Sequence, residues 1–505
     1  MNAKVNLAFY LLMTLFTFFS RKIFLDRLGA DFIGLTGTLQ NILGLLNLAE
    51  LGIGSAVSFV LYKPIKQGDQ QCISEIISVF GYYYRKIGLV VLGIAVLLSL
   101  FFPLIFKETI FNYSLIYFAF YAFLLSALIG YFVNFRQILL SADQKKYIVT
   151  AYFQTANIVK IVVQMLVALY ATNLYVWVAI ELSFALIYAF ILNRKISQHY
   201  PWLQASVKRG AQEYSKYLII LTKTKQVFIH KFKDFLLSQS DQILVFAFVS
   251  LKMVAYYGNY VMVVSKLTML FSTTMDGMFA SVGNLIAEND HRKIQQVFWE
   301  LVCVRFYIGG VVVFSVYHLV EPFISLWLGP DYILDQSILI LLMVSTFIML
   351  TRGAVDMFNA GYGNYGDLWA AWIEGGICLT VTIIAASHWG LIGILIGKLA
   401  SLLPIVVIWK PIYLYREGFH LPLKAYWKEV AFYYVAFGIA YVAIHWLARM
   451  IPLDPAVDYY HLIVYAVMVS SSFMLVYLVS LYLLTEGAKS LVRRALAFVP
   501  INRKR

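Results

Sequence analysis

Charged residues and cysteine are both scarce in this 505-residue chain. Only 13% of its residues are charged, whereas 61% are hydrophobic and 17% are aromatic. A water-soluble domain carries about 25% charged and roughly 45–50% apolar residues, so this balance excludes an ordinary soluble enzyme. The three cysteines have no spacing that predicts a disulfide framework or a metal motif: Cys72, Cys303 and Cys378.

Polar residues are few, and apolar segments fill most of the chain. A helix needs about 20 apolar residues to cross a bilayer. Hydropathy predicts fourteen such spans, so we expect an all-α polytopic membrane protein. The predicted spans centre on residues 5–20, 37–62, 87–106, 114–134, 148–170, 174–192, 228–250, 254–284, 298–319, 336–358, 367–386, 391–409, 431–448 and 461–484.

Positive charge exceeds negative charge, with 40 Lys and Arg against 26 Asp and Glu and a net charge of +14. In a soluble protein such a surplus would suggest nucleic acid as a partner. When both termini are placed in the cytoplasm, most of the cations fall in cytoplasmic segments and few in external loops, as the positive-inside rule requires. The surplus therefore indicates topology, and we expect no nucleic-acid binding.

The longest polar stretch, residues 193–227, divides the first twelve spans into six plus six. It predicts an N-terminal lobe over 1–192, a basic cytoplasmic connector over 193–227, a C-terminal lobe over 228–410, and two further spans with a basic tail over 411–505. Two short segments resemble each other at equivalent turns of the two lobes, 141–147 and 359–365, and this favours a duplicated architecture.

Proline and glycine mark three further local features. The segments Lys63-Pro64-Ile65 and Lys410-Pro411-Ile412 are predicted to stop helices, because proline cannot continue a regular helix. The segment from Gly393 to Lys398 resembles a truncated phosphate-binding loop but lacks its spacing and its Ser or Thr. Because it lies in an apolar helix, we interpret Gly393 and Gly397 as a GxxxG face for close helix packing.

Catalytic motifs are absent from the sequence, which has no HExxH, no paired-Asp sugar-nucleotide motif and no GxSxG. The external loops are short and hold no catalytic-looking cluster. We therefore expect a transporter without a resident cofactor or metal. A membrane-embedded glycan polymerase or glycosyltransferase stays an alternative, although such enzymes commonly carry a large external loop.

Charged side chains nevertheless occur inside the predicted spans, where each costs about 2.5–3.5 kcal/mol. Polar residues recur at helical spacing on several spans, for example Asn157, Lys160 and Gln164, and this predicts a shared hydrated cavity. The cations expected to line it are Lys160, Lys266, Arg305, Arg352 and Lys398, and a cation-rich cavity suits an anionic, phosphate-bearing substrate. The candidates for coupling to a proton or Na⁺ gradient are Asp241, Asp276, Asp356 and Glu374. On the seventh span, Asp241 shares a face with His230, Asp234 and Ser238.

A structural role stays open for each of these residues. Arg352 could be neutralised by Asp356, and Lys266 by Asp276, in pairs that only hold helices together. Lys160 and Lys398 could extend to the lipid headgroups. The last two spans, which are nearly all aliphatic and aromatic, either pad the bundle against lipid or border a groove for a substrate's lipid tail.

Several segments resemble the Wzx-type polysaccharide and O-antigen flippases of the multidrug/oligosaccharidyl-lipid/polysaccharide exporter superfamily. The resemblance rests on Arg27-Leu28-Gly29-Ala30-Asp31-Phe32-Ile33-Gly34-Leu35, Glu50-Leu51-Gly52-Ile53-Gly54-Ser55-Ala56, His230-Lys231 through Asp241, Tyr256-Tyr257-Gly258-Asn259-Tyr260 and Ser281-Val282-Gly283-Asn284-Leu285. It implies two six-helix lobes around a V-shaped, alternating-access cavity, as in MATE transporters, plus two C-terminal helices. By similarity, Arg21, Lys22 and Arg27 reach this cavity and bind substrate.

The resemblance implies transport of an undecaprenyl-pyrophosphate-linked oligosaccharide across the bacterial inner membrane, with both termini in the cytoplasm. Its partners would be membrane lipids, a polysaccharide polymerase and glycosyltransferases. The lipid II flippase branch shares the architecture, but its arginine-rich first two spans are not matched, since span two has no internal Arg or Lys. A cation-coupled multidrug exporter of the same superfamily is the alternative within transport.

Overall fold

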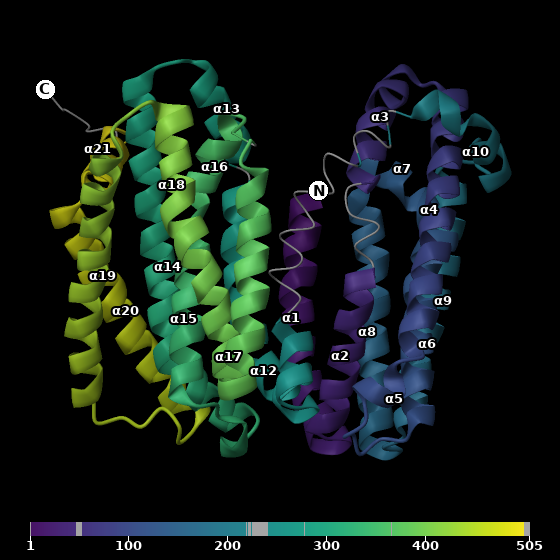
Figure 1. Cartoon of the computed structure of the whole chain (residues 1–505), viewed down its shortest axis with the longest axis horizontal. Coiled ribbons are helices and arrows are strands. Elements are labelled where there is room, and N and C mark those ends of the chain that lie inside the picture. Colours follow the sequence, from purple (N-terminus) through teal and green to yellow (C-terminus); the bar gives the residue numbers. More distant parts are fainter. Residues whose placement is uncertain are drawn as a thin grey trace, which may run out of the picture. The chain divides into compact units, whose positions relative to one another are not determined.

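In the computed structural model, all regular secondary structure of the described part is helical, and no strand occurs there. It describes residues 2–46, 53–218, 220, 224, 241–276, 278–364 and 366–498. The chain forms two compact units, unit 1 over Met1–Ala255 and unit 2 over Tyr256–Arg505. The described helices, drawn in Figure 1, confirm the prediction of an all-α polytopic membrane protein.

Unit 1 consists of long apolar helices joined by short helical turns. Its elements are α1 (Asn2–Leu28), α2 (Ala30–Leu46), α3 (Ile53–Gln67), α4 (Gln70–Ser99), α5 (Phe102–Ile105), α6 (Tyr113–Phe132), η2 (Asn134–Arg136), α7 (Gln137–Ala142), α8 (Lys146–Tyr170), α9 (Leu174–His199), α10 (Val207–Glu213) and η3 (Tyr214–Tyr217), and residues 241–248 are also helical. The closest neighbours are α1 with α8, α6 with α9, and α4 with α10.

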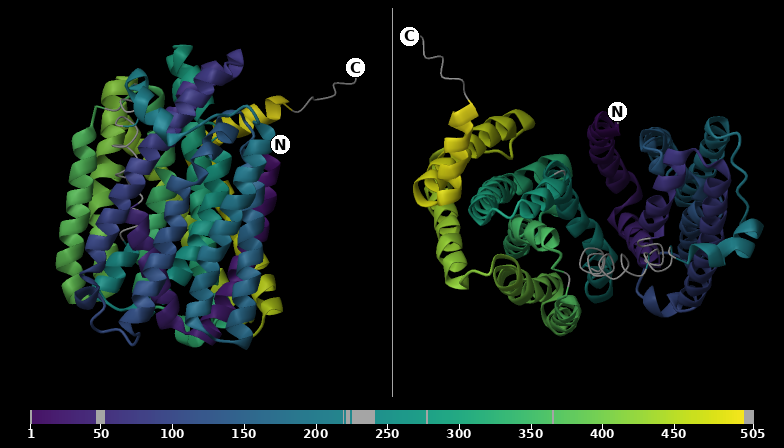
Figure 2. Two further views of the ribbon diagram at one scale, coloured as in Figure 1. Left: turned by 90° about the vertical axis from the view of Figure 1, so that its right-hand side faces the viewer. Right: turned by 90° about the horizontal axis from the view of Figure 1, so that it is seen from above.

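Unit 2 also consists of long apolar helices joined by short helical turns. Its elements are α12 (Leu251–Asp276), which begins within unit 1, α13 (Phe279–Ala287), α14 (His291–Trp327), η4 (Pro330–Tyr332), α15 (Gln336–Thr351), α16 (Gly353–Gly361), α17 (Leu368–Leu402), η5 (Leu403–Trp409), α18 (Lys410–Tyr413), η6 (Leu414–Phe419), α19 (Leu423–Met450), α20 (Tyr459–Leu484) and α21 (Glu486–Phe498). The helices α19 to α21 lie along one side of this unit, where α20 and α21 contact α14 (Figure 2).

Ten stretches of the described chain are long and apolar enough to cross a membrane. One of them, Trp369–Phe419, contains a sharp backbone break at Gly390 and covers both the eleventh and the twelfth predicted spans. The predicted spans 37–62 and 228–250 contain residues outside the described ranges, and 254–284 corresponds to the more polar α12 and α13. The other predicted spans each match one apolar stretch.

The GxxxG interpretation of residues 393–397 is confirmed by packing within α17. The helix folds back at Gly390, so its second half lies against its first half. A Cβ added at Gly393 would overlap the backbone of Ala385, and one added at Gly397 would overlap Thr382. The two glycines therefore permit backbone contact, and no phosphate loop is formed.

The two predicted helix stops at Lys-Pro-Ile are wrong. α3 continues past Pro64 and ends before Gly68, whose left-handed φ of +70° breaks the helix. The later helix continues past Pro411 to Phe419 and ends at His420, which is also left-handed. Pro411 lies two residues after the end of the π-helical η5, and the wider turns of a π-helix leave room for a proline ring that would clash in a regular α-helix.

Candidate functional site

The three cations predicted near the end of span one lie inside helix α1, which continues to Leu28 instead of ending near residue 20. Arg21 is half-buried, and its Nη2 donates a hydrogen bond to the carbonyl oxygen of Ala255 at 3.0 Å. Lys22 and Arg27 are exposed on the surface of unit 1. One of the three is thus held against the unit's own backbone, and two project from it.

Arg305 is the most buried of the predicted cavity cations. Its side chain is 8% exposed within α14, and its Nη1 donates to the carbonyl oxygen of Leu350 at 3.4 Å. Its Nη2 lies 3.2 Å from the sulfur of Met357, and its guanidinium lies over the ring of Phe271 at 5.8 Å. The guanidinium also touches Gly353, where a Cβ would overlap it. Arg305 therefore joins α14 to α12, α15 and α16.

Arg352 occupies the junction between α15 and α16. Its Nε lies 3.1 Å from Oδ2 of Asp356, one turn along the chain, and the two side chains are 19% and 34% exposed. The neighbouring residue is Gly353, against which Arg305 packs. The structure thus brings three predicted residues to one place in unit 2: Arg305, Arg352 and Asp356.

An apolar groove of about 560 Å³ lies between α14, α15, η5 and α19 in unit 2. Its walls include Met343, Val344, Phe347, Phe437 and Tyr441, and almost all of its surface is carbon. Three wall residues, Ile348, Val407 and Tyr434, also line a small adjoining pocket that contains Arg352. The groove therefore adjoins a small pocket, of about 30 Å³, whose lining includes Arg352.

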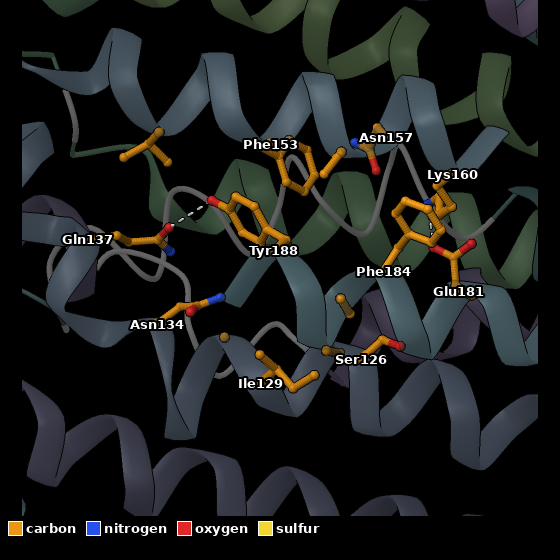
Figure 3. A pocket seen from close by; sticks show the side chains of 15 residues that line it. Ser126, Ile129, Asn134, Gln137, Phe153, Asn157, Lys160, Glu181, Phe184 and Tyr188 are labelled. Atoms are coloured by element: carbon orange, nitrogen blue, oxygen red, sulfur yellow. Dashed lines mark hydrogen bonds and ion pairs between the residues drawn. The ribbon is translucent and has the colours of Figure 1, made fainter. Parts of the chain in front are cut away.

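A second cavity, of about 550 Å³, lies in unit 1 between α6, α8 and α9. At one end, Nζ of Lys160 contacts Oε1 of Glu181 at 2.6 Å, and Nε2 of Gln164 donates to Oε2 of the same carboxylate at 3.2 Å. The other end has amide and phenol groups, with the Tyr188 hydroxyl donating to Gln137 (Figure 3). Lys160 thus contacts an acid of the neighbouring helix instead of extending to headgroups.

The remaining predicted residues lie apart from these clusters. Lys266 on α12 and Lys398 on α17 are half-buried, Asp241 is 8% exposed, and Glu374 on α17 is fully buried. The side chain of Asp276 and the residues His230, Asp234 and Ser238 lie outside what the structure describes. Within the described ranges, no three His, Cys, Asp or Glu side chains gather as a metal site would require.

Glu181 is the residue that sequence reasoning missed. Helices α8 and α9 are joined by a short turn at 171–173 and run antiparallel. Lys160 precedes this turn, and Glu181 follows it, by similar numbers of residues, so both lie at a similar depth. The pairing of a lone lysine on span five with a lone acid on span six could have been predicted from this register.

The fold of this chain is similar to two solved transporter structures. Lipid II flippase MurJ, in an inward closed conformation, aligns with a TM-score of 0.65 over 97% of this chain and 99% of that chain, at 13% identity. An inward-facing multidrug resistance transporter of the MATE family, from the MOP superfamily, aligns with a TM-score of 0.57 over 83% of this chain and 98% of that chain, at 15% identity. At these identities the likeness shows a shared fold. No family model and no curated protein sequence matches the chain.

Proposed function

We propose that this protein is a flippase that moves an undecaprenyl-pyrophosphate-linked oligosaccharide, the repeat unit of a polysaccharide such as O-antigen or capsule, across a bacterial inner membrane by alternating access. The observation that carries the proposal is the apolar groove of unit 2, which adjoins the small pocket lined by Arg352. A prenyl chain matches the apolar walls. A pyrophosphate matches a guanidinium, whose planar N–H groups bind phosphate oxygens in pairs.

The fold supports a lipid-linked substrate. The lipid flippase aligns with 97% of this chain, whereas the multidrug transporter aligns with 83%. Helix α19, which belongs to the first of the two extra predicted spans, forms one wall of the groove. Span two has no Arg or Lys of its own, so we favour an oligosaccharide-bearing lipid over lipid II.

The remaining parts of the proposal follow from this substrate. The glycan would occupy a hydrated cavity while the tail stays in lipid. A proton or Na⁺ gradient would drive transport through one or more of the buried acids. Both termini would be cytoplasmic, and a polymerase and glycosyltransferases would act on the substrate before or after transport.

Complementation of a bacterium that lacks its own flippase tests the groove. We expect Arg352→Ala to lower surface polysaccharide by about tenfold or more, because a hydrogen bond to a charged group is worth about 1.5–3 kcal/mol. Val344→Trp, which fills the groove without touching a charge, is expected to do the same. The matched controls are Arg416→Ala, an arginine with a 75% exposed side chain, and Val467→Trp on the exposed face of α20. Full polysaccharide from both groove variants, at normal membrane levels, would refute the proposal.

A multidrug exporter is the second candidate, and the MATE-type alignment favours it. A drug exporter would confer resistance on a sensitive strain without any effect on surface glycan. If the protein confers resistance that Val344→Trp abolishes, and surface polysaccharide is unchanged, drug export becomes the favoured function and the flippase proposal is rejected.

A further inference from the structure

Lys160 and Glu181 form an ion pair in the interior of two membrane-crossing helices. Their side chains are 15% and 21% exposed, and the two charged atoms are 2.6 Å apart. Each helix meets the length and composition of a membrane span. A charge at such a depth is costly, so the pair is stable only while each side chain neutralises the other.

A cavity with polar side chains at both ends connects this pair to one end of unit 1. Along α8 its lining runs from Val149, in the first turn, to Lys160, a rise of about 16 Å at 1.5 Å per residue. The same end holds Asn134 of η2 and Gln137 of α7, and Asn157 lies next to the pair (Figure 3). By the sequence prediction this end faces the cytoplasm. The cavity therefore gives water a path to a carboxylate deep in the bundle.

The chemistry of the pair favours a proton over a metal cation as its ligand. The ammonium group of Lys160 occupies one carboxylate oxygen of Glu181, and Gln164 donates to the other. A hard cation needs several oxygen ligands, and here the two positions are filled by N–H donors. A proton can bind the carboxylate without displacing any ligand oxygen.

We propose that Glu181 is the proton-binding site that couples this protein to a proton gradient, and that its partner Lys160 converts proton binding into a conformational change. This rests on the proposed flippase function. Protonation of Glu181 leaves Lys160 uncompensated within the membrane. The protein then favours a conformation in which the ammonium leaves Glu181 and is hydrated through the cavity. A ligand shifts an equilibrium when it prefers one state, and here the proton prefers the state with the pair open.

The groups that face Glu181 are few. Lys160 on α8 is charged, and Tyr188 on α9 is the other titratable residue of the cavity lining. The elements α6, η2 and α7 contribute neutral side chains to that lining: Ser126, Asn134 and Gln137 among the polar ones. The pH response of the cavity is therefore assigned to the Lys160–Glu181 pair.

Accessibility of a cysteine in the cavity tests the proton site without any substrate. In full-length protein whose own cysteines are replaced, Ser126→Cys places a thiol in the cavity wall, and Ser197→Cys places a reference thiol at the exposed end of α9, outside the middle of the span. The ratio of their modification rates by a small water-soluble thiol reagent removes the effect of thiol ionisation. We expect this ratio to rise several-fold on acidification, and to become independent of pH in Glu181→Gln. The control Glu417→Gln, at an exposed position of unit 2, should keep the rise.

Transport in vesicles gives the second arm. An imposed pH gradient should change the flipping rate of the wild type, and Glu181→Gln should flip at one rate with or without the gradient. The neutral double variant Lys160→Met with Glu181→Gln removes both charges, so the bundle has no unpaired charge to destabilise it. This variant should also lose the response. A retained response in either variant would overturn the proposal.

The two proposals fail in different ways. A wild type that does not flip lipid, but whose cavity labelling depends on Glu181, would overturn the flippase and leave the proton site standing. A wild type that flips lipid with a gradient response unchanged by Glu181→Gln would leave the flippase standing and remove the proton site.

Discussion

At the scale of single residues, charged side chains inside the bundle are stabilised by tertiary contacts that could not be predicted from the sequence. Arg305 is held by a backbone carbonyl, a sulfur and an aromatic face, all contributed by elements other than its own helix. Gly353 packs directly against the guanidinium of Arg305, and any Cβ at residue 353 would overlap that group. The buried arginine and Gly353 therefore form one structural feature.

Gly353→Ala tests this feature. The added methyl group must displace Arg305, and overpacking of this kind costs on the order of 1–3 kcal/mol. We expect a lower unfolding temperature in detergent. The matched control is Gly375→Ala in α17, where a Cβ meets no atom within 4 Å, and alanine there should be neutral or stabilising by up to about 1 kcal/mol. Equal unfolding temperatures for the two variants would contradict the packing of Arg305.

Asp143, in the turn between α7 and α8, gives a prediction about acid stability. Burial opposes its charge, but hydrogen bonds from Lys145 and Tyr200 and the charge of Lys145 outweigh burial, so the pKa of Asp143 is lowered. A lowered pKa adds stability that is complete above the ordinary aspartate value of about 4 and is lost as the pH falls through the folded value. Unfolding followed from pH 6 downward should show less acid sensitivity in Asp143→Asn than in the wild type. An unchanged pH profile would disprove this contribution.

At the scale of elements, both units hold a short amphipathic helix against a buried acid. In unit 1, Glu75 of α4 accepts hydrogen bonds from Arg209 of α10 and Tyr217 of η3, both at 3.0 Å. In unit 2, Glu300 of α14 accepts from Arg494 of α21 at 2.9 Å. Both α4 and α14 begin with an aspartate cap that follows a left-handed residue. The two helices are thus anchored by the same chemistry.

Removing one anchor should loosen one helix. Arg494→Ala leaves Glu300, whose side chain is 3% exposed, without its charged partner, whereas Arg494 itself is 56% exposed. Because the arginine is solvated, we expect a loss of only about 1 kcal/mol, or roughly fivefold faster hydrogen exchange in α21. Lys489→Ala, which removes an exposed pair within the same helix, should leave the exchange rate nearly unchanged. Equal rates in the two variants would mean that Glu300 does not anchor α21.

Much of the architecture could be predicted from hydropathy, because long apolar runs have few alternatives to a membrane-crossing helix. The tertiary partners of the charged side chains inside the bundle could not be predicted in this way. Arg305 and Phe271 meet through tertiary packing between distant helices, which no spacing rule in the sequence encodes. The proline stops failed because both helices continue past the proline, and each ends at a later left-handed residue, Gly68 or His420. Glu181 could have been found, because a hairpin fixes its register with Lys160.

At the scale of the whole molecule, the chain combines a fold shared with solved transporter structures and an apolar groove of about 560 Å³ in unit 2. The chain shares its fold with a lipid II flippase over nearly its full length and with a multidrug transporter over less of it. The groove between α14, α15, η5 and α19 adjoins the small pocket that Arg352 lines, and the lining of the cavity in unit 1 includes Lys160 and Glu181. We propose that the first binds a prenyl-pyrophosphate and that the second binds a proton.

The most direct measurement is lipid flipping by the purified protein. Vesicles would contain undecaprenyl-pyrophosphate bearing a fluorescent oligosaccharide, and an impermeant quencher would be added outside. The account predicts that wild-type protein and Arg416→Ala make the inner-leaflet fluorescence quenchable, whereas Arg352→Ala and Val344→Trp leave it largely protected, as in vesicles without protein. Protection in wild-type vesicles, or equal quenching by all four proteins, would contradict the central claim.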